Sequence, residues 1–168
     1  MHDTHERLLA CIPRLRRYAR ALVGRREDAD DLVQDTMERA WDRLASWQAG
    51  TDMRAWLFGI MHNLHVDRLR RQPPACDALD EDTLMNAAVN NPSAGLEMRD
   101  METALMLLPV DQREVLLLVA LENMRYEQVA EALHIPVGTV MSRLSRARAR
   151  LHALLEGQPG APALKVVK

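Results

Sequence analysis

Apolar residues recur every three or four positions along most of the chain, which is the spacing of one buried face on an α-helix. Glycine or proline interrupts this repeat at intervals, as at Gly24, Gly50 and Pro109. Pro13 falls inside the first repeat and predicts a kink or a later start near Arg14. The pattern therefore predicts an all-α protein, with helices at about 5–23, 27–47, 53–71, 96–108, 111–121, 126–133 and 137–155.

The last two predicted helices are separated by a very short turn. Only His134 and Ile135 precede Pro136, and proline suits the first turn of a helix because the N–H that it lacks would have no partner there. The second of these helices has no acidic residue. Its outer face carries Thr139, Ser142, Arg143, Arg146 and Arg150. A solvated surface helix usually mixes charges of both signs, so the pattern favours a helix-turn-helix whose second helix enters a DNA major groove.

A stretch without helical periodicity separates the first three predicted helices from the rest. It begins at Pro73 and holds four acidic residues and no basic residue as far as position 95. Such a long structureless stretch is uncommon inside one domain, so it indicates a flexible acidic linker between two small helical domains. A short helix at 79–89 stays open. We expect a domain at 1–72, a linker at 73–95, a domain at 96–156 and a disordered tail at 157–168.

The second predicted helix has an acidic outer face, although the net charge of the whole chain is only −2. This face is formed by Asp28, Asp31, Gln34, Asp35 and Glu38. The opposite side of the same helix, which includes Trp41, is predicted to lie in the core. Acidic residues in the first turn of a helix interact favourably with its dipole, but Asp35 and Glu38 lie beyond that turn. The remaining interpretation is a surface that docks on a basic protein partner.

Composition and spacing argue against several other classes of protein. No apolar run reaches the length of a transmembrane helix, and the first residues lack the apolar core of a secretory signal, so we expect a cytoplasmic protein. Cys11 and Cys76 are far apart, and His62 and His65 lack a third ligand, so we expect neither a disulfide framework nor a metal. No catalytic or cofactor-binding motif is present, so we expect no enzyme and no cofactor.

Phe58 stands beside Gly59 on the side of the third predicted helix that is expected to be more exposed, together with Arg54, His62 and His65. Two interpretations of the aromatic ring stay open. It packs on a neighbouring helix, or it is presented to unstacked bases of a nucleic acid.

Four blocks of sequence resemble a known family. They are DADDLVQDTMERAW (28–41), TDMRAWLFGIMHNLHVDRLRR (51–71), LPVDQREVLLLVALENMRYEQVAEAL (108–133) and VGTVMSRLSRARARL (137–151). In this order they resemble the extracytoplasmic-function (ECF) sigma factors, small members of the sigma-70 class that keep only regions 2 and 4. The resemblance implies that 1–72 is the region 2 domain and 96–156 is the region 4 domain. It also implies a non-catalytic subunit that directs RNA polymerase to promoters.

The resemblance further implies three binding surfaces. The β′ clamp helices of core RNA polymerase would contact Asp31, Gln34, Asp35 and Glu38. The −10 promoter element would be recognised and melted by Trp47, Gln48, Arg54, Phe58, His62 and Asn63, with a flipped base held in the loop 47–52. The −35 element would be contacted by Thr139, Ser142, Arg143 and Arg146. Residues 97–121 would pack on the polymerase β flap, and an anti-sigma factor would control the protein.

Three positions depart from the usual family pattern, namely Met53, His134 and Met141. Family members often have an aromatic residue, a glycine and a lysine there. We expect His134 to adopt a left-handed conformation, which costs a non-glycine residue about 1 kcal/mol. The alternative function is a helix-turn-helix regulator that acts without joining polymerase, but it leaves the blocks at 28–71 unexplained.

Overall fold

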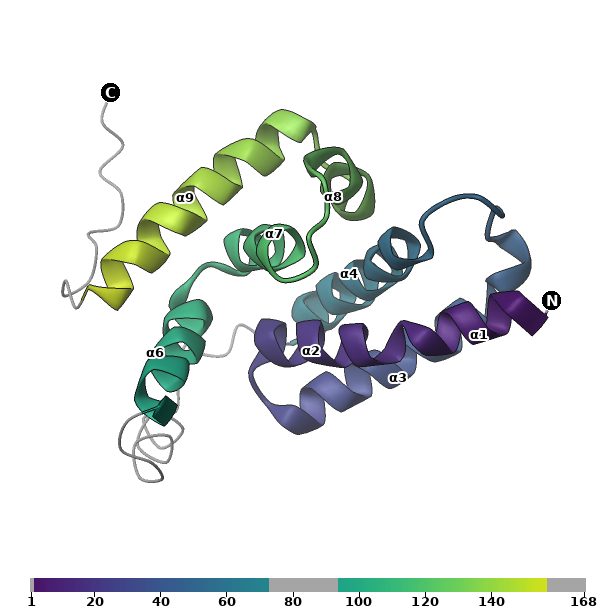
Figure 1. Cartoon of the computed structure of the whole chain (residues 1–168), viewed down its shortest axis with the longest axis horizontal. Coiled ribbons are helices and arrows are strands. Elements are labelled where there is room, and N and C mark those ends of the chain that lie inside the picture. Colours follow the sequence, from purple (N-terminus) through teal and green to yellow (C-terminus); the bar gives the residue numbers. More distant parts are fainter. Residues whose placement is uncertain (1, 73–93, 157–168) are drawn as a thin grey trace.

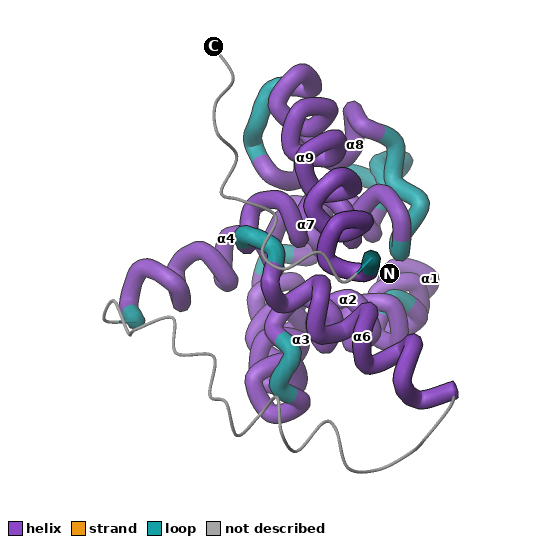
Figure 2. Tube along the Cα trace, turned by 90° about the vertical axis from the view of Figure 1, so that its left-hand side faces the viewer, coloured by secondary structure: helices purple, strands orange, loops and turns teal. Residues whose placement is uncertain are grey.

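The structure is a computed structural model that describes residues 2–72 and 94–156. The described residues form helices and connecting turns, without a strand, as Figures 1 and 2 show. The N-terminal half contains α1 (His2–Ala10), α2 (Ile12–Val23), α3 (Arg26–Asp42), the 3₁₀ turn η1 (Leu44–Ser46) and α4 (Met53–Arg71). The C-terminal half contains α6 (Ala94–Leu107), α7 (Val110–Ala120), α8 (Tyr126–Leu133) and α9 (Val137–Leu155). The all-α prediction is confirmed.

Local signals set most helix ends in the N-terminal half. Pro13 lies in the first turn of α2, so the predicted helix 5–23 is divided in two at Cys11. Gly24 ends α2 with a φ of 77°, a conformation that favours glycine. The side chain of Asp52 caps α4 by accepting a hydrogen bond from the backbone N–H of Arg54 at 2.9 Å. The helix predicted at 27–47 is shorter than expected, because α3 ends at Asp42 and η1 follows.

The C-terminal half ends in the predicted helix-turn-helix. α8 and α9 have the predicted bounds, and His134 between them is left-handed with a φ of 55°. The apolar stripe of α9 is buried at Val140, Leu144 and Ala147. The backbone conformation expected at His134 is therefore confirmed.

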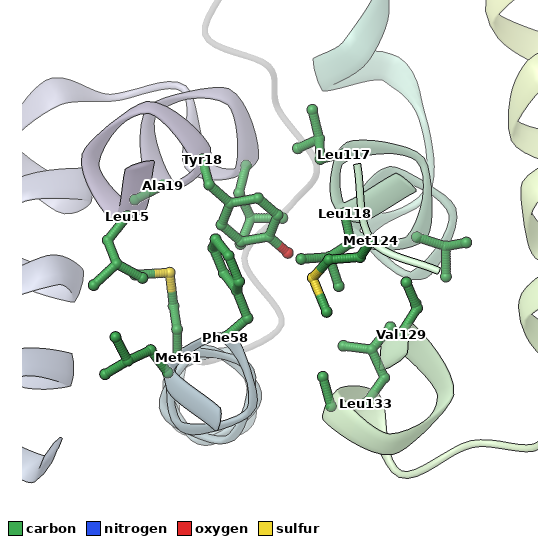
Figure 3. Close-up of a cluster of buried hydrophobic side chains, with 14 of the residues drawn as sticks. Leu15, Tyr18, Ala19, Phe58, Met61, Leu117, Leu118, Met124, Val129 and Leu133 are labelled. Atoms are coloured by element: carbon green, nitrogen blue, oxygen red, sulfur yellow. The ribbon is translucent and has the colours of Figure 1, made fainter. Parts of the chain in front are cut away.

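The two halves pack against each other and share one core. α4 packs on α8, and α2 packs on α7 (Figure 1). Figure 3 shows the junction, where side chains of α2 and α4 meet those of α7 and α8. It is formed by Leu15, Tyr18, Ala19, Phe58, Met61, Leu117, Leu118, Met124, Val129 and Leu133. We call this arrangement the packed form. In it every residue of α7 from Gln112 to Leu118 is buried.

Three side chains differ from their predicted exposure. Trp41, predicted to lie in the core, is 52% exposed. Phe58 and His65, predicted to be more exposed, are only 2% and 6% exposed. The reason for Phe58 is that the C-terminal half covers the outer side of α4, which makes packing on a neighbouring helix the correct interpretation of its ring.

Two other predictions lie outside the described residues, namely the short helix at 79–89 and the tail at 157–168. The predicted linker also lies outside them, except that its last two positions already belong to α6. None of the helices in 2–72 and 94–156 is long and apolar enough to cross a membrane.

Candidate functional site

The acidic face of α3 is open to solvent. Asp31, Gln34 and Glu38 are exposed, and the amide of Gln34 donates a hydrogen bond to Glu38 Oε1 at 3.1 Å. Asp35 is half-buried because Arg68 of α4 pairs with its carboxylate. The four residues predicted to bind polymerase therefore lie together on one helix, and three of them are free to meet a partner.

An apolar hollow adjoins this acidic face. It is lined by Leu9, Ile12, Met37, Glu38, Trp41 and Asp42. The exposed indole of Trp41 packs against the ring of His5 from α1 in a tilted arrangement, with ring centroids 4.6 Å apart. Sequence periodicity misses this hollow, because Trp41 follows the helical repeat of the core although its side chain is exposed. An acidic rim around an apolar floor suits a partner helix that carries both apolar and basic side chains.

The residues predicted to contact the −35 element lie on α9. Ser142 and Arg146 are exposed, and the Arg146 guanidinium donates to Ser142 Oγ at 3.3 Å. Thr139 is half-buried, and its carbonyl accepts from the Ser142 hydroxyl at 3.1 Å. Arg143 turns toward α7, where it pairs with Asp111 at 3.6 Å. The outer face of α9 is thus open to solvent at Ser142 and Arg146, while Arg143 is engaged in an ion pair with α7.

The residues predicted for the −10 element are not all on one exposed surface. Gln48 and Asn63 are exposed, whereas Trp47 is half-buried and its indole N–H has no hydrogen-bond partner within the described residues. Phe58 lies against Tyr18, with ring centroids 4.9 Å apart. His62 Nδ1 lies 2.8 Å from a carboxylate oxygen of Glu114 in α7. The packed form therefore covers part of the set with the C-terminal half.

Polar contacts hold the C-terminal half over these residues. Gln128 of α8 donates to Asp52 at 3.0 Å, and Arg54 donates to the Glu122 carbonyl at 3.3 Å. Burial raises the pKa of Asp52, but hydrogen bonds from Arg54 outweigh this effect and leave the pKa below its usual value. Asp52 therefore stays ionised and serves both halves of the molecule, because it caps α4 and accepts a hydrogen bond from α8.

Arg113 at the start of α7 makes a further contact between the two halves, which sequence reasoning missed. Its guanidinium donates to four backbone carbonyls, those of Leu22, Leu105, Met106 and Leu108, at 2.7–2.9 Å. Leu22 belongs to α2, whereas the other three lie at the end of α6 and just beyond it. Burial lowers the pKa of Arg113 below its usual value. One side chain thus binds the C-terminal ends of two helices from different halves.

The protein families that match the chain follow the same division. Residues 8–62 match the family described as the Sigma2 domain of PhyR, and residues 98–151 match Sigma-70, region 4. A relative, the ECF RNA polymerase sigma factor EcfG of Rhodopseudomonas palustris, is 40% identical over 151 residues, which cover 88% of this chain and 82% of that protein. This chain therefore belongs to the ECF RNA polymerase sigma factors.

Solved structures of sigma factors have the same fold. The sigma factor RpoE of Bartonella quintana, in complex with the anti-sigma factor NepR, matches with a TM-score of 0.76 and 32% identity, covering 95% of this chain and 100% of that chain. CnrH in complex with the cytosolic domain of CnrY matches with a TM-score of 0.70 and 29% identity, covering 94% of this chain and 90% of that chain. These matches span both halves of the described structure.

Proposed function

We propose that this sigma factor binds core RNA polymerase through α3, recognises the −35 element with α9, and melts the −10 element with α4 and the loop 47–52. The proposal is carried by the separation of charge between two exposed surfaces. The acidic face of α3, with the apolar hollow beside it, suits a protein helix, whereas the acid-free outer face of α9 suits a phosphate backbone. Since polymerase performs the chemistry of RNA synthesis, we assign no catalytic role to this chain. We expect it to act in the cytoplasm, where it would meet polymerase and DNA.

The two halves must separate for this function. In the packed form Phe58 and His62 are covered by α7 and α8, and α7 itself is buried from Gln112 to Leu118. Contact of α4 with an unwound strand, and of 97–121 with the β flap, both require these surfaces to be free. We infer that polymerase binds the open arrangement, fixes the spacing of the two DNA-binding halves and so raises their effective concentration at a promoter.

An anti-sigma factor is the partner expected for the packed form. RpoE of Bartonella quintana, which this chain resembles over nearly its whole length, binds the anti-sigma factor NepR. A partner that holds α4 against α8 would keep the −10 surface covered without contacting DNA. We expect such a protein to co-purify with this chain from unstressed cells, and repeated purification of the chain alone would count against this control.

The experiment that tests the proposal is run-off transcription with purified core polymerase, with and without this protein, on a pool of genomic promoter fragments. Discrete new start sites are expected, and the sequences upstream of them would reveal the −35 and −10 preferences. Absence of polymerase binding and of transcripts, from protein shown to be folded, would contradict the proposal and favour a helix-turn-helix regulator.

A pair of variants tests the polymerase surface. Asp35→Ala with Glu38→Ala is expected to weaken polymerase binding about ten-fold on every promoter, because both carboxylates lie at the proposed interface. Asp3→Ala with Glu6→Ala on α1 removes the same charge from exposed positions and serves as the control. Equal polymerase affinity of the two double variants would exclude α3 as the docking surface.

A further inference from the structure

The carboxylate of Glu122 is buried at the junction of the two halves in an unusual way. Glu122 lies in the turn between α7 and α8 and is only 1% exposed. Its Oε1 accepts a hydrogen bond from Arg17 of α2 at 3.1 Å, while its Oε2 is buried and has no hydrogen-bond partner within the described residues. A buried carboxylate with an unpaired oxygen is costly, and a buried ion pair is weak evidence for stability. Stability alone therefore gives no good reason for this residue.

The turn that carries Glu122 binds two arginines of the N-terminal half. Arg17 donates to the carboxylate and also to the carbonyl of Leu121 at 3.1 Å. Arg54 donates to the carbonyl of Glu122 at 3.3 Å. One turn thus presents a carboxylate and two carbonyl oxygens to two guanidinium groups. A phosphodiester group would offer its own anionic oxygens to the same arginines, because the guanidinium fork binds carboxylates and phosphates in the same way.

The helix that carries Arg17 is strongly basic. α2 holds four arginines and no acidic residue, and all four arginines are exposed. One of them, Arg14, lies near the same point as Arg54. Burial raises the pKa of the Cys11 thiol, and the charges of Arg14 and Arg54 both act against this rise. Arg17 therefore lies on a basic helix, and Arg54 adds positive charge near the end of α2 where Arg14 lies.

The position of the two arginines fits a single strand held by the neighbouring loop. Arg54 pairs with Asp52 at 3.3 Å, and Asp52 is the last residue of the loop 47–52. A strand with one base held in that loop would have to pass the start of α4, where Arg54 lies.

We propose that Arg17 and Arg54 form a binding site for a phosphodiester of the melted −10 strand, and that Glu122 occupies this site in the packed form. The inference rests on the proposed promoter-melting function. DNA and the turn 121–122 then compete for the same two guanidinium groups, so entry of the strand displaces the C-terminal half. Removing the charge of Glu122 should favour DNA binding even in the absence of polymerase.

The first test uses the full-length free protein and a fluorescein-labelled oligonucleotide of twenty thymidines, because binding to phosphate does not depend on base sequence. Fluorescence anisotropy over a range of salt concentrations would compare the wild type with Glu122→Gln, which keeps the side-chain shape. We expect Glu122→Gln to bind about five-fold more tightly, with a salt dependence steeper by about 0.7 for each additional phosphate that the protein binds. Circular dichroism would show that the variant is folded.

Two further substitutions locate the effect. Arg17→Gln, added to Glu122→Gln, is expected to remove the increase in affinity. Arg20→Gln changes the charge equally one turn further along α2, and its side chain forms no ion pair within the described residues, so it should leave most of the increase. Unchanged affinity of folded Glu122→Gln, or equal losses from the two arginine substitutions, would overturn the inference.

A second measurement does not depend on the folding of a Glu122 variant. Holoenzyme containing Arg17→Gln should bind a promoter fork with an unpaired −10 strand about five-fold more weakly than holoenzyme containing Arg20→Gln. Equal affinities would overturn the inference. The proposed function is judged separately by wild-type run-off transcription: if the wild type initiates but the two arginine variants behave alike, the sigma function stands and the phosphate site does not.

Discussion

The packing of α4 on α8 leads to a graded prediction at Gly59. A β-carbon at this position would lie 3.5 Å from the carbonyl oxygen of Ala132 and 3.8 Å from its α-carbon, which are ordinary van der Waals distances. Alanine therefore fits without movement of α8. Since glycine inside a helix is less favourable than alanine by about 0.5–1 kcal/mol, we expect Gly59→Ala to stabilise the protein by that amount.

A larger side chain at Gly59 should act as a wedge between the two halves. Gly59→Leu adds three carbons beyond a β-carbon that is already in contact with backbone, and backbone yields less readily than a flexible side chain. Overpacking of this kind costs about 1–3 kcal/mol. We expect Gly59→Leu to be less stable than Gly59→Ala by this amount. The loss should come from the contact between α4 and α8 rather than from the interior of either half.

Small-angle X-ray scattering and urea unfolding would measure these effects. The wild type and Gly59→Ala should have the same radius of gyration, and Gly59→Leu a larger one. Gly138→Leu is the control, because a β-carbon at Gly138 in α9 would meet no atom within 4 Å. If Gly59→Leu were as compact and as stable as Gly59→Ala, α8 would not lie against α4 in solution and the packed form would be wrong.

Four further predictions follow from contacts described above. Phe58→Ala should lower the free energy of unfolding by about 3–5 kcal/mol, as for a buried aromatic side chain, and a loss below about 0.5 kcal/mol in urea unfolding would mean that the ring is exposed. Arg113→Met should cost more than about 3 kcal/mol in the same assay, because it leaves four carbonyls without their donor. Burial lowers the pKa of His65 below its usual 6.5, so below that pH the unfolded chain binds a proton that the folded chain does not bind. The free energy of unfolding should therefore fall as the pH drops below 6.5. The difference between the free energies of unfolding at pH 7.5 and pH 5.5, measured in urea, should be smaller in His65→Leu than in the wild type. Arg143→Ala should weaken −35-dependent promoter binding by holoenzyme by about 1–3 kcal/mol, whereas Asp111→Asn, which removes only its ion-pair partner, should preserve it.

Helix positions could be predicted from the sequence because their signals are local. α4, α8 and α9 have the predicted bounds, because the apolar repeat and the prolines near their ends are local features of the sequence. The left-handed turn at His134 is expected instead from the family pattern, in which a glycine often stands at this position. An apolar stripe such as that of α9 also identifies its own buried face. These features depend on residues that are near one another in the chain.

Contacts between the two halves could not be predicted in this way. Phe58 is buried by Tyr18, forty positions earlier, and by residues about sixty to seventy-five positions further along the chain, and nothing near it in sequence indicates them. Gln112, Arg113 and Glu114 form a polar triplet that would ordinarily be assigned to the surface, yet all three are buried. Trp41 shows the reverse error, because its helical spacing is that of a core residue although its indole lies at the surface.

The hydrogen bonds of Arg113 affect how readily the two halves separate and come together again. Of its four carbonyl partners, only that of Leu22 lies in the N-terminal half. Separation of the halves breaks this one bond, and the freed carbonyl becomes accessible to water. The other three bonds stay intact and keep the charged group paired. Arg113 thus links the two halves through a single hydrogen bond, which costs little free energy to break and can form again. Separation of the halves therefore requires no local unfolding of the C-terminal half.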